Sequence, residues 1–188
     1  MIKLIAFSGS TRTGSLNKKL VSCAATIFKD KGVEVEVIDL ADYDMPIYNG
    51  DIDKDSFPEN AVRLYNKFKE ADGFVISSPE YNSSFSPLLK NVIDWVSRPQ
   101  NSEPSLTALS GKTVMLIAAS MGPLGGIRGI YHLRWVLENV FMHVSPAIMD
   151  LPVAHEAFDE LGNLKEEKYK KMLTDSALKM INLTEKLK

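Results

Sequence analysis

A turn rich in hydroxyl and glycine residues separates the first apolar run of the chain from the helical pattern that follows. The run ends at Ser8, and residues 9–17 are Gly-Ser-Thr-Arg-Thr-Gly-Ser-Leu-Asn. The first turn of a helix leaves backbone N–H groups without partners, and its aligned peptide dipoles favour negative charge there. Serine and threonine hydroxyls add further donors. This pattern predicts a cradle for a terminal phosphate group.

Other phosphate chemistries fit this turn poorly. Residues 9–15 have the glycine spacing of a nucleotide P-loop, but no lysine precedes Ser15, so NTP hydrolysis is not expected. The glycine fingerprint of nicotinamide-binding folds, the cysteine of a thiol phosphatase and the acidic cluster of a phospho-receiver are all missing. Ser10 and Ser15 could also simply shape the turn and cap the helix. Arg12 either grips phosphate oxygens with its planar guanidinium or is a surface charge.

Two later loops carry residues suited to the rest of a ligand. Residues 78–87 include the rigid Pro79 and the aromatic Tyr81, on which a flat ring could stack. Glu80 is interpreted as an electrostatic or hydrogen-bonding wall rather than a base. Residues 120–126 contain three glycines, which allow close backbone approach or positive φ. Together the three loops match a ligand with a phosphate at one end and a conjugated ring at the other.

The elements that must position these loops form an α/β pattern. β-rich runs alternate with helical patterns, which indicates a parallel sheet with helices on both faces. The runs are residues 2–8, 33–38, 73–77, 113–119 and a weaker one at 143–149. The common order 2-1-3-4-5 places the reversal of chain direction between the first and third strands, where ligands bind. The Glu-containing second run should lie towards an edge.

Composition limits the class of protein. With 188 residues, 22 basic and 24 acidic side chains and a net charge of -2, the chain has the size of one domain and lacks a nucleic-acid or membrane-surface footprint. Neither a signal peptide nor a membrane-length apolar run is present, so a cytoplasmic protein is expected. The single Cys23 excludes an internal disulfide and a cysteine-rich metal site. The three scattered histidines are interpreted as structural or surface residues, and no metal ligands are assigned.

Two helical patterns are apolar over more than one face. They cover residues 87–98 and 127–140 and contain the two tryptophans, Trp95 and Trp135. A second apolar face needs something to bury against. Deep burial within one chain would satisfy it, and so would a homo-oligomer interface, which we expect because the tryptophans add a large apolar area.

Two motifs together resemble those of the NADPH-dependent FMN reductase family, which has a flavodoxin-like fold and includes quinone, azo-dye and chromate reductases. They are Gly9-Ser10-x-Arg12-x-Gly14-Ser15-x-Asn17, and Pro79-Glu80-Tyr81-Asn82 followed by Leu89-Lys90-Asn91-x-Ile93-Asp94-Trp95. The resemblance covers nearly the whole chain and implies a three-layer sandwich, with residues 1–188 as a single FMN-binding domain. It assigns the FMN phosphate to Ser10, Arg12, Ser15, Leu16 and Asn17, the isoalloxazine ring to Pro79, Glu80, Tyr81 and Asn82, and the border of the ring to Ser120, Gly122 and Gly125.

The resemblance also implies an activity. NADPH or NADH would deliver hydride to FMN and dissociate, and a quinone, azo, metal or flavin acceptor would then take the electrons in a ping-pong course. The cofactor carries the chemistry, so no side chain is assigned as catalytic. Family members are usually dimers or tetramers, so a homodimer or homotetramer is expected.

Three residues of the sequence depart from the family pattern. Ser83 stands where glycine is common, and Met121 and Pro123 alter the third loop. These changes put the lip of the pocket, and with it substrate choice, in question.

A flavodoxin-type electron carrier without NAD(P)H turnover is the main alternative, but such carriers are usually strongly acidic. A cofactor-free scaffold with the same fold is the third possibility.

Overall fold

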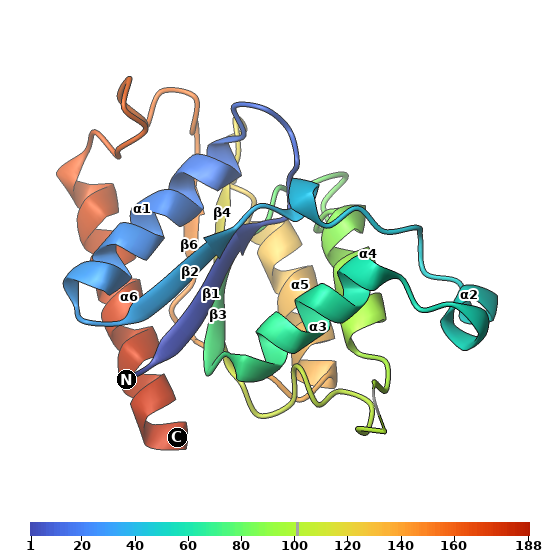
Figure 1. Ribbon diagram of the computed structural model, residues 1–188. Coiled ribbons are helices and arrows are strands. Elements are labelled where there is room, and N and C mark those ends of the chain that lie inside the picture. The colour runs from blue at the N-terminus through green and yellow to red at the C-terminus, as the bar shows by residue number, and fades with distance from the viewer. Residues whose placement is uncertain (101) are drawn as a thin grey trace.

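The computed structural model describes residues 1–100 and 102–188 and contains one parallel β-sheet (Figure 1). Its central part has the order β2-β1-β3-β4, formed by the strands β1 (Lys3–Ser8), β2 (Glu34–Ile38), β3 (Gly73–Ser77) and β4 (Thr113–Ala119). At the far edge, β5 (His143–Val144) and β6 (Met149–Leu151) both pair with β4 in parallel. The predicted order 2-1-3-4-5 is confirmed, as is the edge position of β2, which pairs with β1.

The fifth position of the sheet is divided between two short strands. Between β5 and β6 the chain passes through Ser145 and Pro146, and proline has no backbone N–H to give to a sheet ladder. The Ser145 N–H still donates to the Val114 carbonyl at 2.8 Å. The weak run predicted at residues 143–149 is therefore two pairings with β4 rather than one continuous strand.

Helices cover both faces of the sheet (Figure 1). One face carries α1 (Leu16–Asp30) and α6 (Glu167–Leu187), and the other carries α3 (Glu59–Glu70), α4 (Pro87–Val96) and α5 (Ile127–Asn139). The sheet divides the core because successive strand residues point to opposite faces. In β1, Leu4 and Ala6 pack on the α1 side, whereas Ile5 and Phe7 pack on the α3 side.

The helix boundaries follow local sequence signals. α1 begins after its N-cap Ser15, and Gly32, with φ of 78°, follows its end in the left-handed conformation that favours glycine. α4 begins with Pro87 after the N-cap Ser86, whose Oγ accepts from the Leu89 N–H at 3.3 Å. A serine hydroxyl therefore caps the N-terminus of each of these two helices.

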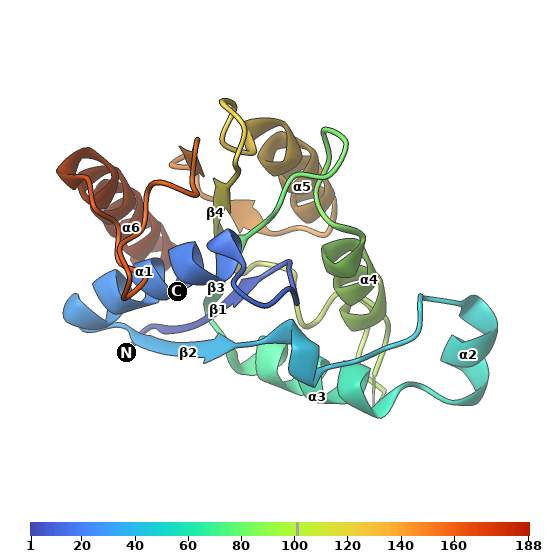
Figure 2. The ribbon, with the colours of Figure 1, turned by 90° about the horizontal axis from the view of Figure 1, so that it is seen from above.

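An arm of residues 43–58 extends from the body of the molecule (Figures 1 and 2). The arm contains the short helix α2 (Gly50–Asp55) and follows the 3-10 turn η1 (Leu40–Asp42). It packs on Trp95 of α4: the indole N–H donates to the Pro46 carbonyl at 2.8 Å, and the ring meets Tyr48 and Phe57 edge-on. Trp95 is therefore fully buried, and the second apolar face of α4 is covered within the chain.

Two further features concern the class of protein. Among the helices that the structure describes, none combines the length and the apolar character needed to span a bilayer. Cys23 is half-buried on α1, its Sγ lies 3.3 Å from the Gly162 carbonyl oxygen, and burial raises the pKa of its thiol. A thiol with a raised pKa is a poor nucleophile, so Cys23 is suited to packing rather than to chemistry.

Candidate functional site

Three loops meet at the carboxyl edge of the sheet, which faces the viewer in Figure 2. They follow β1 (residues 9–15), β3 (78–86) and β4 (120–126). Backbone hydrogen bonds connect them: the Gly9 N–H donates to the Ser77 carbonyl at 2.9 Å, and the Ser78 N–H donates to the Ile117 carbonyl at 3.0 Å. A Cβ on Gly9 would lie 2.5 Å from the Leu89 side chain, so only glycine lets the first loop pack on α4.

The first loop presents donors that the protein itself does not use. Within residues 1–100 and 102–188, no acceptor is found for the backbone N–H groups of Thr13, Gly14, Leu16 and Asn17. Arg12 is exposed, and within the same ranges its guanidinium takes part in neither a hydrogen bond nor an ion pair. Unused N–H groups at a helix N-terminus beside a free cation are the features of an anion site.

Two serines shape this loop. Ser10 is buried, and its Oγ accepts from the Arg12 N–H at 3.3 Å. Ser15 caps α1, its Oγ accepts from the Lys18 N–H at 3.4 Å, and its own N–H donates to the Arg12 carbonyl at 3.2 Å. Both serines thus have the turn-forming role weighed from the sequence, and both hydroxyls lie beside the unused donors.

Asn17 connects three elements through its side chain. Its Oδ1 accepts from the Ala119 N–H and from the Ser77 hydroxyl, each at 2.9 Å, and its Nδ2 donates to the Ala119 carbonyl at 2.9 Å. This buried carboxamide joins the first turn of α1 to the ends of β3 and β4. Its backbone N–H, rather than its occupied side chain, is the group free to meet a ligand.

Ser8 is a candidate residue that the sequence alone does not single out. Its Oγ is buried without a hydrogen-bond partner among the residues that the structure describes. Ser8 pairs in register with Ser77, whose side chain reaches Asn17, so the Ser8 side chain lies on the same face, below the start of α1. Buried hydroxyls normally have partners, so this one is suited to a polar ligand atom. The sequence signal was a polar residue that ends an apolar strand.

Glu80 is hydrogen-bonded to the first turn of α5. Its carboxylate accepts from the Arg128 Nε at 2.8 Å and from the backbone N–H groups of Arg128 and Gly129 at 3.1 and 3.2 Å. Burial opposes the charge of Glu80, but the hydrogen bonds and charge of Arg128 and the Gly129 N–H outweigh it and lower the carboxyl pKa. Glu80 therefore joins the second loop to the N-terminus of α5.

Tyr81 stands at the start of a tight turn. Its N–H donates to the Ser84 carbonyl at 2.8 Å, and the Ser84 N–H donates back to the Tyr81 carbonyl at 3.0 Å. The central residues Asn82 and Ser83 have φ of 51° and 67°. Positive φ at both positions is typical of a type I′ turn and explains why glycine is common at position 83.

An open groove of about 810 Å³ adjoins this turn. It is lined by Glu80, Tyr81, Asn82, Ser84, Phe85, Ser86, Pro87 and Lys90. Half of the Tyr81 side chain is exposed, whereas Pro79 is buried behind it. Residues 9–17 do not line this groove, so the three loops share one edge of the sheet without sharing one cavity.

Two of the three glycines of the third loop are required by packing against the sheet. Gly125 and Gly126 have φ of 60° and 93°, and added Cβ atoms would lie 2.9 Å from Asp150 and 2.8 Å from Ala118. Gly122 has no positive φ, and its N–H donates to the Ser120 Oγ at 3.2 Å. The predicted positive φ thus occurs at two of the three glycines.

The chain is similar to known proteins over most of its length. The family model for NADPH-dependent FMN reductase matches residues 2–156. The chain is 34% identical over 174 residues to an NAD(P)H-dependent FMN reductase of Pseudomonas aeruginosa, covering 92% of this chain and 89% of that protein. It is also 34% identical over 194 residues to an NAD(P)H:quinone oxidoreductase of Solanum tuberosum, covering 100% and 95%.

Among solved structures, FerB of Paracoccus denitrificans, a flavoenzyme NAD(P)H:(acceptor) oxidoreductase, has a similar fold. It superposes with a TM-score of 0.79 at 28% identity and covers 99% of this chain and 98% of its own.

Replacement of Ser83 by glycine should stabilise the protein. The left-handed conformation costs an L-residue about 1–2 kcal/mol, and glycine avoids that cost while losing more backbone entropy on folding. We expect Ser83→Gly to raise the free energy of unfolding by about 0.5–1 kcal/mol in urea titrations. Asn82→Gly is the matched control and should gain less, because asparagine tolerates positive φ. A loss of stability in Ser83→Gly would contradict the assigned turn.

Removal of the Glu80 charge should destabilise the fold in a pH-dependent way. The folded-state pKa of Glu80 is lowered, so its contribution is complete above its ordinary value near 4.5 and is lost as the pH falls through the folded-state pKa. Glu80→Gln should therefore reduce the free energy of unfolding by about 2 kcal/mol at pH 7 and by progressively less in acid. Urea titrations across this pH range measure it.

The control for this experiment is Glu138→Gln, which removes an exposed carboxylate that pairs with Arg134 on the outer side of α5. Exposed pairs contribute little, so its effect should stay below about 0.5 kcal/mol. Equal stability of the wild type and Glu80→Gln at pH 7 would rule out the proposed attachment to α5.

Proposed function

Because the chain belongs to the NADPH-dependent FMN reductase family, we propose that its carboxyl-edge loops bind FMN and that it transfers electrons from NAD(P)H to a small-molecule acceptor. The family match and the full-length relatives make it an NAD(P)H-dependent oxidoreductase of the FMN or quinone reductase type. The observation that carries the FMN proposal is the set of unused N–H donors beside Arg12 in the first loop.

The residues present fit the phosphate end of FMN. The ligand would receive N–H donors from Thr13, Gly14, Leu16 and Asn17, and the Arg12 guanidinium, which has no carboxylate partner in the described part of the chain, would balance its charge. The orphaned Ser8 hydroxyl below α1 offers one more donor. Ser10 and Ser15 would hold the loop in shape around the ester.

The second and third loops would hold the ring. Bound FMN would supply the redox chemistry by taking two electrons from NAD(P)H and giving them to the acceptor in separate half-reactions. Tyr81 and Asn82 would flank the ring, and Glu80 would fix their turn against α5. Ser120, Gly122 and Gly125 would form the opposite border. Because every loop comes from one sheet, we treat residues 1–188 as one FMN-binding domain.

A quinone is the acceptor class that we propose first. Relatives named quinone reductases or quinone oxidoreductases occur in plants and bacteria, including one of Escherichia coli that is 38% identical over 138 residues. The groove beside Tyr81 is lined by the apolar Phe85 and Pro87 together with polar groups, which suits a flat, partly polar molecule. Azo compounds, metal oxyanions and free flavins are the other acceptors to compare.

An exposed aromatic stripe on α5 supports a homo-oligomer. Tyr131 and Trp135 lie four residues apart on one face and are 56% and 71% exposed, and Phe141 just beyond the helix is 65% exposed. The second face of α4, in contrast, is covered by the arm. Large exposed aromatics at helical spacing are typical of an interface.

A charged residue in this stripe should separate the copies. We expect Trp135→Glu to lower the mass measured by light scattering from a dimer or tetramer to a single chain, because a buried carboxylate without a partner is costly. Leu178→Glu on α6, also an exposed apolar residue, is the control and should leave the mass unchanged. An unchanged mass of Trp135→Glu, or a wild type that is already a single chain, would contradict the assignment.

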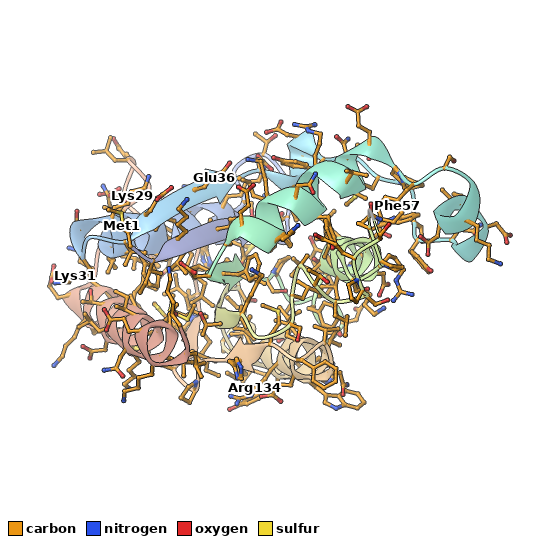
Figure 3. The ribbon with its side chains drawn as sticks, turned by 60° about the horizontal axis from the view of Figure 1, so that its bottom comes forward. Met1, Lys29, Lys31, Glu36, Phe57 and Arg134 are labelled. Atoms are coloured by element: carbon orange, nitrogen blue, oxygen red, sulfur yellow. The ribbon has the colours of Figure 1, made fainter. Side chains whose placement is uncertain are left out.

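Removal of Arg12 should weaken FMN binding without unfolding the protein. A charge-assisted hydrogen bond contributes about 1.5–3 kcal/mol, so Arg12→Ala should raise the FMN dissociation constant by roughly 10- to 100-fold in fluorescence titrations. Lys29→Ala, at the other end of α1 (Figure 3), removes the same charge and should change little. Equal affinities of wild type and Arg12→Ala would refute this role.

Activity is tested with the FMN-loaded protein in the absence of air. Rapid bleaching of the flavin absorbance on addition of NADPH or NADH is expected, followed by reoxidation on addition of a quinone. A spectrum that persists in the presence of either nucleotide would favour the electron-carrier alternative.

A further inference from the structure

A lysine on the first turn of α1 connects the phosphate loop to the end of β2. The Lys18 Nζ lies 2.5 Å from the Asp39 Oδ2 and donates to the Thr11 carbonyl at 3.4 Å. The Lys18 side chain is 29% exposed. The two groups that hold its ammonium are 7 and 21 residues away in the sequence and come together with it only in the fold.

The hydrogen bond from Lys18 to the Thr11 carbonyl fixes the orientation of the Thr11–Arg12 peptide group. In a trans peptide the C=O and N–H point in opposite directions. With its carbonyl turned towards Lys18, the Thr11–Arg12 peptide directs the Arg12 N–H the other way, where it donates to the buried Ser10 Oγ at 3.3 Å. The backbone from which the Arg12 side chain extends is therefore held on both sides.

Asp39 is itself fixed to the sheet. It follows Ile38, the last residue of β2, which pairs with Phe7 of β1. The Asp39 Oδ1 accepts from the Ala41 N–H at 3.0 Å as the N-cap of η1. Partial burial opposes ionisation of Asp39, but Lys18 and the Ala41 N–H overcome it and lower the carboxyl pKa, so the pair stays charged at neutral pH.

Paired charges of opposite sign add little net potential at the phosphate site. Arg12 has no carboxylate partner in the described ranges, whereas Lys18 is neutralised by Asp39. The two basic residues thus differ in kind: Arg12 is suited to contact the ligand, and Lys18 is suited to hold the loop.

We propose that Lys18 and Asp39 are positioning residues, which hold the Thr11–Arg12 peptide and thereby set the affinity of the site for the phosphate of FMN. This inference rests on the proposed function. It deepens that function by dividing the basic groups of the first loop into one that binds and one that orients.

A double-mutant cycle distinguishes positioning from simple electrostatics. If the pair acts as one device, Asp39→Asn and Lys18→Met should each raise the FMN dissociation constant by roughly tenfold, and the double variant should be no weaker than either. Lys18→Arg should restore much of the affinity. If only charge matters, Asp39→Asn should tighten binding by freeing a cation while Lys18→Met weakens it, and that result would overturn the inference.

Riboflavin, which lacks the phosphate, provides a second measurement in the same proteins. Its affinity should be the same in wild type and variants, because the pair holds only the phosphate loop. Equal losses for riboflavin and FMN would show a general structural defect and would also overturn the inference. Both titrations use quenching of flavin fluorescence, so neither depends on turnover.

The control ion pair lies on the same edge strand. Glu36 of β2, labelled in Figure 3, pairs with Lys67 of α3 at 2.6 Å and is exposed. Glu36→Gln removes a similar carboxylate far from the first loop and should leave both affinities unchanged. Failure of wild type to bind FMN would refute the proposed function, whereas tight binding by wild type, Asp39→Asn and Lys18→Met alike would refute only the positioning role.

Discussion

Three hydrogen bonds of the Asn17 carboxamide fix the N-terminus of α1, where we propose that phosphate binds. They join the first turn of α1 to the ends of β3 and β4, and all three partners are buried. A helix N-terminus has unused N–H groups wherever it lies, but only a fixed one can present them at the edge where three loops meet. Because buried polar groups must be paired, displacement of α1 would leave the Asn17 amide and the Ala119 backbone unsatisfied.

The first and second loops at this edge are held by groups that leave the proposed ligand contacts free. Glu80 is paired with Arg128 and the start of α5, and Lys18 is paired with Asp39, so neither charge remains to attract a ligand. The Arg12 guanidinium and the first-turn N–H groups are the donors left over. This division between groups that shape the edge and groups that stay unpaired is what preorganised binding of an anion requires.

Local and periodic features of the fold could be predicted from the sequence. Alternation of β-rich runs and helical patterns predicted the parallel sheet, and the common strand order of such sheets predicted the order that the structure shows. The long-range partners of polar side chains could not be predicted, because Asn17 meets residues 60 and 102 positions away and Lys18 meets one 21 away. Trp95 was similarly ambiguous, since no helical pattern shows that an arm from residues 43–58 will cover it. The residue types of the loops identified the candidate residues. Which of them hold the loops and which stay free for a ligand follows only from their contacts in the fold.

The central claim, that a phosphate dianion lies at the first turn of α1, is tested most directly by ³¹P NMR of FMN bound to this protein. A free phosphate monoester takes up its second proton near pH 6. The first-loop donors and Arg12 favour the dianion and lower that pKa. We expect a resonance of bound FMN that is distinct from that of free FMN and whose chemical shift stays constant between about pH 5.5 and 8. A bound resonance that titrates near pH 6, as free FMN does, would contradict it.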